Sequence, residues 1–151
     1  MRSSVPGMVI GLILVVCMLI VSPLYYVSII EWAKAESEIM SDTSNLIDKV
    51  IDTRVLTDDM LADYNIAVAA KAIKYRTTII RETKIVNPDP LNPGNTYTTY
   101  VLVDDLSTWE QGDIITITVE PIGESIYSRV SKSMLGLSVD SDGFTLSGRV
   151  R

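Results

Sequence analysis

Residues 5–30 have the sequence VPGMVIGLILVVCMLIVSPLYYVSII, a run of 26 residues without Asp, Glu, Lys or Arg. A helix that crosses the apolar core of a bilayer needs only about 20 apolar residues. Pro23 interrupts the run, and a kinked membrane helix tolerates a proline because neighbouring groups satisfy the carbonyl that it frees. The stretch therefore predicts a transmembrane helix near the N-terminus and argues against a purely cytosolic protein.

The charges on either side of this run predict its orientation. Arg2 precedes the run, whereas three acidic residues follow it, namely Glu31, Glu36 and Glu38. The positive-inside bias then predicts a single-pass protein of the cell membrane with residues 1–4 in the cytoplasm and the rest extracytoplasmic. A cleaved secretory signal is the alternative, because Ala33-Lys34-Ala35 has the small-x-small cleavage pattern. This pattern lies after a charge and after an apolar run longer than the usual core of about 7–15 residues, so a retained anchor is favoured.

Helical spacing continues beyond the apolar run. Two rows of residues repeat every seven positions: Trp32, Ile39 and Leu46, and Ala33, Met40 and Ile47. Because no Pro or Gly occurs between Pro23 and Asp52, we expect the membrane helix to extend outward as a stem to about Asp52. The rows either pack on the protein's own head or form a seam with other copies, and so few heptads do not decide between the two.

Residues 57–151 carry the patterns of a small α+β domain. Thr57-Asp58-Asp59 marks a helix start, with a capping hydroxyl and acidic residues in the first turn. Alternation of period two predicts strands after this helix, and the Pro-rich segment 87–95 predicts a hairpin connection. The expected order is a helix from Thr57 to about Ala72, strands over 73–86, 96–103 and 115–119, a helix over 125–135 capped by Gly136, and a strand over 144–150. The sequence thus predicts a membrane anchor over 1–30, a helical stem over 31–56 and an extracytoplasmic head over 57–151 with an antiparallel sheet of about four strands and two helices.

The residue types present exclude most catalytic chemistry. The chain has no His, and Cys17, its one cysteine, lies inside the apolar run. This removes Ser-His-Asp and Cys-His nucleophiles, His-based zinc sites and any intrachain disulfide. Asp140 and Asp142, before Gly143, are weak calcium candidates, because the segment lacks the third acidic ligand and the final Glu of a calcium loop. We therefore expect neither catalytic residues nor a cofactor, and an enzyme is the least favoured class.

The charge balance argues against nucleic acid as a partner. The net charge is −6, and an acidic surface repels a phosphate backbone. Five basic residues nevertheless gather in one stretch, namely Lys71, Lys74, Arg76, Arg81 and Lys84. We interpret this stretch as a solvated sheet edge, whose charges discourage aberrant strand pairing.

The organisation resembles that of pilins, and more narrowly the TadE-like pseudopilins of tight-adherence (Tad) pili and related pilin-like proteins of Gram-positive bacteria. The segments that carry the resemblance are Leu56-Thr57-Asp58-Asp59 opening a helix before a strand, Gly112-Asp113-Ile114-Ile115-Thr116-Ile117-Thr118-Val119, and the terminal strand Phe144-Thr-Leu-Ser-Gly-Arg-Val150. The resemblance covers most of the chain, but only as a pattern. It implies a pilin-like fold and a structural subunit of a Tad or type IV-like pilus or secretion assembly.

The resemblance also implies a leader-processing site and an assembly face on the apolar helix. Gly7 and Met8 are the candidate processing residues, although pilins have a Glu five residues after the glycine and this chain has Leu12 there. Gly11, Leu14 and Val15 form the expected helix-assembly face. The implied partners are membrane lipid and other pilin-like subunits or pilus assembly proteins, with no nucleic acid or small-molecule substrate. The alternative function is a bitopic envelope protein that binds a protein partner through its head without polymerising.

Overall fold

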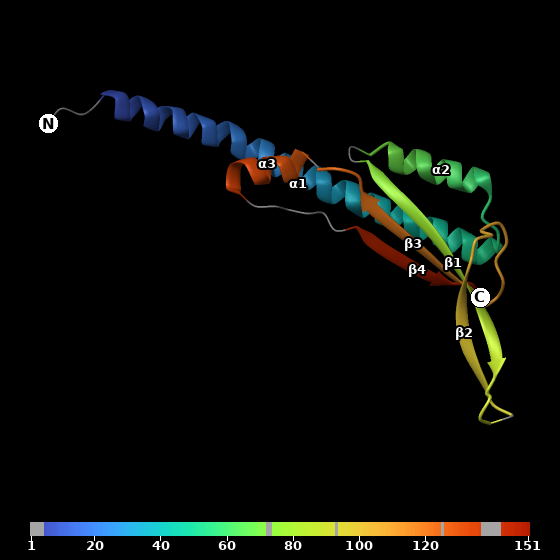
Figure 1. Ribbon diagram of the computed structural model, residues 1–151. Helices are drawn as coiled ribbons and strands as arrows, with labels where there is room; N and C mark the ends of the chain where they lie inside the picture. Colours follow the sequence, from blue (N-terminus) through green and yellow to red (C-terminus); the bar gives the residue numbers. More distant parts are fainter. Residues whose placement is uncertain (1–4, 72–73, 93, 125, 137–142) are drawn as a thin grey trace. The chain divides into compact units, whose positions relative to one another are not determined.

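The computed structural model describes residues 5–71, 74–92, 94–124, 126–136 and 143–151. The elements are α1 (Val5–Thr53), α2 (Asp58–Ala69), β1 (Tyr75–Pro88), β2 (Thr96–Val103), β3 (Ile114–Pro121), α3 (Ile126–Leu135) and β4 (Phe144–Arg149). The strands form one antiparallel sheet in the order β2-β1-β3-β4 (Figure 1). The α+β class, the long N-terminal helix and the sheet of four strands are thereby confirmed.

The described chain forms two compact units. One contains the residues up to Lys34 together with those from Glu124 to Gly136, and the other contains Ala35–Gly123 with the residues from Gly143 to Arg151. Helix α1 contributes to both units, because the boundary at Lys34 and Ala35 falls within it. The second unit holds the sheet and is called the head below.

Helix α2 begins at the predicted cap. The side chain of Thr57 accepts a hydrogen bond of 3.2 Å from the backbone N–H of Met60, and Asp58 and Asp59 occupy the first turn. The helix ends at Ala69, a little earlier than expected. Strand β1 begins later and ends later than expected, because its pairing with β2 continues to Pro88 opposite Thr96.

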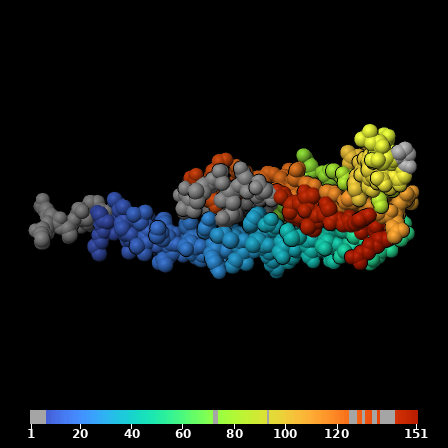
Figure 2. All heavy atoms as spheres, turned by 90° about the horizontal axis from the view of Figure 1, so that it is seen from below, coloured from blue at the N-terminus to red at the C-terminus, as the bar shows by residue number. Residues whose placement is uncertain are grey.

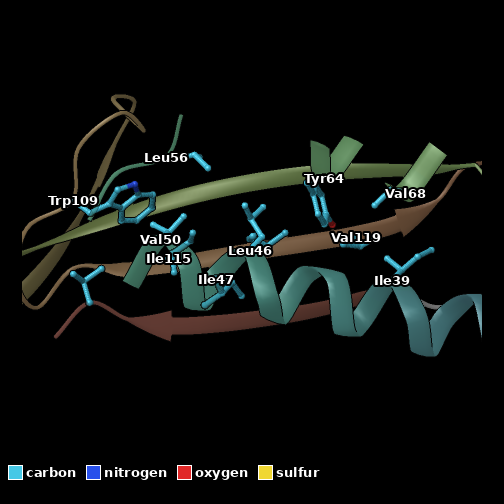
Figure 3. Packing of buried hydrophobic residues seen from close by; sticks show 12 residues of the cluster. Ile39, Leu46, Ile47, Val50, Leu56, Tyr64, Val68, Trp109, Ile115 and Val119 are labelled. Atoms are coloured by element: carbon cyan, nitrogen blue, oxygen red, sulfur yellow. The ribbon is translucent and has the colours of Figure 1, made fainter. Parts of the chain in front are cut away.

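Part of the heptad stripe of α1 packs on the sheet of its own head, whereas Ala33 and Met40 of the second row are exposed. Ile39, Leu46 and Ile47 are buried, and they meet the inward face of β3 (Figure 3). That face consists of Ile115, Ile117 and Val119, the alternating residues predicted for it. For Ile39, Leu46 and Ile47 the structure shows packing on the head, and α1 from Ala35 onward lies in the same compact unit as the sheet.

Helix α2 is joined to α1 by polar contacts as well as apolar ones. The hydroxyl groups of Thr43 and Tyr64 lie 2.9 Å apart in the buried interface, and Thr43 also donates to the carbonyl of Ile39. Nearer the surface, the Lys71 ammonium donates to a carboxylate oxygen of Glu38 at 2.6 Å. This hydrogen bond is the largest cause that raises the pKa of Lys71. These contacts hold α2 and the residues that follow it against α1.

Gly148 is required for the close approach of β4 and α1. A Cβ atom at this position would lie 2.5 Å from Cγ2 of Ile47 and 2.8 Å from Cδ1 of Ile51. We expect Gly148→Ala to lower the free energy of unfolding by about 1–3 kcal/mol, because the added methyl overpacks the core. Gly94→Ala is the matched control, since a Cβ there would meet nothing within 4 Å. Chemical denaturation of both variants in detergent measures the difference, and equal midpoints would contradict this packing.

Candidate functional site

The first candidate site is the bare apolar surface of α1. Every residue from Gly7 to Ile20 is exposed. Apart from Gly7, Gly11 and Cys17, all of these residues are Leu, Ile, Val or Met. None of the other described residues covers this segment (Figure 2). The helix is long and apolar enough to cross a membrane. A contiguous apolar surface of this size on a protein marks a contact with lipid or with another protein.

The residues predicted for processing and assembly all lie on this surface. Gly7, Gly11 and Leu14 are spaced by four and three residues, so the helix places them on one face together with Val15. Leu14 and Val15 are 62% and 57% exposed, and a Cβ atom at Gly11 would meet nothing within 4 Å. Gly7 and Met8 lie within α1, which begins at Val5.

The spacing of the two glycines is a further signal in the sequence. Gly7 and Gly11 form a G-x-x-x-G pattern within an apolar helix. Small residues at this spacing let two helix backbones approach closely in a membrane. The pattern places a small-residue surface on the face predicted for assembly.

Helix α3 lies in the same compact unit as the apolar part of α1. The hydroxyl groups of Tyr25 and Ser131 are 3.3 Å apart, and Ser131 is buried. Lys132 donates to Glu124 at 2.9 Å, a hydrogen bond that is the main cause lowering the pKa of the Glu124 carboxyl. Gly136 has a φ of +65° directly after the helix, which confirms its predicted role as a cap.

The second candidate is a buried ion pair in the head. Asp113 is fully buried, and its Oδ2 accepts hydrogen bonds of 2.8 Å from Nε of Arg81 and 3.0 Å from the backbone N–H of Glu110. Arg81 also donates to the carbonyl of Asp105 at 3.0 Å, and its guanidinium lies 5.5 Å from the centre of the Trp109 ring. The hydrogen bonds of the cluster join β1 to the connection between β2 and β3, because Asp105, Glu110 and Asp113 all lie between Val103 and Ile114.

This pair corrects the interpretation of the basic stretch as a solvated edge. Strand β1 is an interior strand with β2 on one side and β3 on the other. Arg81 is buried, whereas Arg76 on the same strand is exposed. A signal was present in the sequence, because Arg81 continues the alternating set Tyr75, Thr77 and Ile79, which faces the core.

A groove lies at the end of α1, beside the C-terminal end of β4. Its volume is about 970 Å³, and charged residues of both signs line it, namely Asp48, Asp52, Arg54, Arg149 and Arg151. Arg54 has a φ of 57° and donates to the backbone carbonyl of Arg151 at 2.6 Å. Arg54 therefore serves a contact within the chain, and the described lining residues bring no nucleophile and base together.

Metal ligands do not gather among the residues that the structure describes. Within these ranges no three His, Cys, Asp or Glu side chains lie close enough to hold an ion. The weak calcium candidates Asp140 and Asp142 lie outside the described residues. Comparisons with protein-family models, with characterised proteins and with solved structures found no significant match to this chain.

Proposed function

We propose that this chain is a membrane-anchored structural subunit of the pseudopilin type, acting in a Tad or type IV-like pilus or secretion assembly. The observation that carries the proposal is the exposed apolar surface of α1 from Met8 to Ile20. The TadE-like resemblance of the sequence and the order of elements in the head support it. The helix stores the subunit in the bilayer and later packs against other pilin-like helices.

The energetics of the apolar surface favour this dual use. In water, an exposed Leu or Ile side chain is less favourable by about 1.5–3 kcal/mol of transfer free energy than the same side chain when buried. Lipid tails and other apolar helices solvate the surface about equally well, so the helix exchanges one for the other at little cost. The G-x-x-x-G pattern of Gly7 and Gly11 supplies the close packing that makes the exchange specific.

We expect the head to be extracytoplasmic, because Arg2 precedes the apolar run and Glu31, Glu36 and Glu38 follow it. Leu91 is highly exposed at the turn between β1 and β2, so Leu91→Cys offers a reporter of the head. In a Cys17→Ser background, a membrane-impermeant maleimide should label this cysteine in intact spheroplasts. A cysteine at Ser3 should react only after the membrane is opened. Labelling of Ser3→Cys alone in intact spheroplasts would reverse the topology.

Disulfide trapping between membrane helices tests the proposed function. Met18 follows Gly11 by seven residues and lies on the same face of α1. We expect Met18→Cys in the Cys17→Ser background to crosslink to a second copy, or to a pilin-like subunit carrying a matching cysteine, when the secretion apparatus is expressed. Adding Gly11→Leu should abolish these crosslinks while leaving insertion intact, because the new side chain separates the backbones.

Ile13→Phe is the matched control for Gly11→Leu, because Ile13 lies on the opposite side of the helix and its variant also adds bulk to the span. It should leave the crosslinks unchanged. If the wild-type face yields no crosslinks to any pilin-like subunit while the apparatus is present, the subunit proposal fails. The bitopic protein that binds a partner through its head then takes its place.

A further inference from the structure

Half of the β1–β2 hairpin extends beyond the rest of the sheet. Strand β1 pairs with β3 over residues 75–82 and with β2 over residues 81–88, so the two pairings overlap only at Arg81 and Glu82. Beyond that point the hairpin has two strands, and no other strand of the described residues pairs with either of its edges. Figures 1 and 2 show it standing out from the helices of the head. An isolated two-stranded hairpin is marginally stable in water.

The outer edge of β2 lacks the usual protection against strand pairing. Residues 96–103 have the sequence TYTTYVLV, with no charge, no Pro and no Gly over eight residues. Natural edge strands are normally short, charged or interrupted by Pro or a bulge. Among the described strands β2 ends the sheet, so its outer row of backbone groups is unpaired.

The hydrogen-bond alternation identifies which groups this edge presents. The N–H of Asp89 donates to the carbonyl of Asn95, the pair directly beyond Pro88 and Thr96. Along a strand of an antiparallel sheet, the backbone N–H and C=O groups of successive residues point alternately toward the strand on one side and the strand on the other. The odd-numbered residues of β2 therefore bond to β1, and the outward backbone groups belong to Thr96, Thr98, Tyr100 and Leu102.

Apolar side chains are exposed on both faces of the hairpin. Tyr100 and Leu102 lie on one face and are 41% and 67% exposed, whereas Tyr97 and Val101 lie on the other at 48% and 46%. Ile85 and Val86 of β1 are exposed beside them, one on each face. The hairpin thus offers an open edge flanked by apolar groups that the described head leaves uncovered.

We propose that β2 docks on β2 of a second copy of this chain, antiparallel and centred on Tyr100, to form a sheet of four strands from two hairpins. In this register Tyr100 lies opposite the other Tyr100, Tyr97 opposite Val103, and Thr99 opposite Val101. Aromatic pairs and aromatic pairs with β-branched residues are among the stabilising cross-strand pairs. Two added strands also relieve the marginal stability of each hairpin.

Charge favours a second copy as the occupant. Each chain carries a net charge of −6, so most of its surface repels another copy. The strand 96–103 contains no Asp, Glu, Lys or Arg, and the nearest carboxylate, Asp104, falls opposite Thr96 in this register. The edge therefore lets two acidic chains meet without like charges in contact. This contact lies in the head and goes beyond the proposed function, which places assembly on α1.

Disulfide trapping across the two β2 strands tests the proposal on the full chain in native membranes, in the Cys17→Ser background. Opposed residues of a hydrogen-bonded antiparallel pair have Cα atoms about 5.5 Å apart, within the range that a disulfide bridges. Tyr100→Cys should therefore give a covalent homodimer. Tyr97→Cys should not, because two Tyr97 residues in this register are about 20 Å apart at about 3.4 Å per residue. Leu91→Cys at the hairpin turn is a second negative control.

A second variant tests whether the contact uses the outward backbone groups of β2. Thr98→Pro removes an outward N–H but none that bonds to β1, and proline is tolerated on an edge with its missing donor facing solvent. Combined with Tyr100→Cys, it should reduce the homodimer at least tenfold. Equal crosslinking from cysteines at Tyr97, Leu91 and Tyr100 would overturn the proposal. So would a Tyr100→Cys variant that forms no crosslinks, or that crosslinks only to proteins of another mass. The α1 variant Gly11→Leu leaves this homodimer unchanged, so failure here is distinguishable from failure of the helix contact.

Discussion

Replacing Arg81 with Ala is expected to lower the free energy of unfolding by about 3–5 kcal/mol, the usual cost of removing one partner from a buried ion pair. Asp113 is fully buried, and the Arg81 guanidinium is the cation that meets its carboxylate, with two nitrogens 2.8 Å from Oδ2. The variant also frees the carbonyl of Asp105 and removes the guanidinium beside Trp109. Denaturation in detergent, followed by Trp109 fluorescence in a Trp32→Phe background, measures the loss.

Two further variants separate the ion pair from a general effect of charge. Arg76→Ala removes an exposed cation from the same strand, and we expect a change within about 0.5 kcal/mol. The double variant Arg81→Met with Asp113→Leu should be more stable than Arg81→Ala, because it leaves no buried charge without its partner. A loss for Arg81→Ala no larger than that for Arg76→Ala would show that the pair does not hold the head together.

The second large effect is expected in the membrane. Leu14→Asp combined with Val15→Asp places two charges in the middle of the apolar run, each at a cost of about 2.5–3.5 kcal/mol on insertion scales. The remaining Leu, Ile and Val residues, roughly a dozen, each favour insertion by about 0.3–0.6 kcal/mol. The free-energy cost of the two charges then nearly cancels the favourable insertion free energy of the apolar residues. Membrane insertion therefore changes from complete to marginal. Carbonate extraction of membranes should release most of the double variant and none of the wild type.

Leu14→Phe combined with Val15→Phe is the matched control, because it alters the same two positions and keeps the span apolar. We expect this protein to stay in the carbonate-resistant fraction. If the double Asp variant also stays there, α1 does not cross the bilayer through these residues, and both the anchor and the assembly face are refuted.

Local patterns in the sequence were enough to predict the elements of this protein. The uncharged run from Val5 to Ile30 predicts the apolar helix from its own length and composition, without information from any other segment. The buried face of β3, with Ile115, Ile117 and Val119, follows from an alternation of period two. The cap at Thr57 likewise depends on residues within one turn of helix. The candidate assembly residues Gly11, Leu14 and Val15 lie on one helical face for the same local reason.

Tertiary structure decided what each element packs against. The stripe with Ile39 and Leu46 suits a coiled coil or a sheet equally well, and only the position of β3 shows which surface covers it. Arg81 is an interior residue because β1 pairs with β3, where Arg81 lies opposite Ile115. The same pairing brings Arg81 to Asp113, which is 32 residues further along the chain. The overhang of the β1–β2 hairpin arises in the same way, from the registers of two ladders on one strand. Strand pairing joins segments that are distant in the chain, and hydrophobic periodicity within one segment contains no information about its partner.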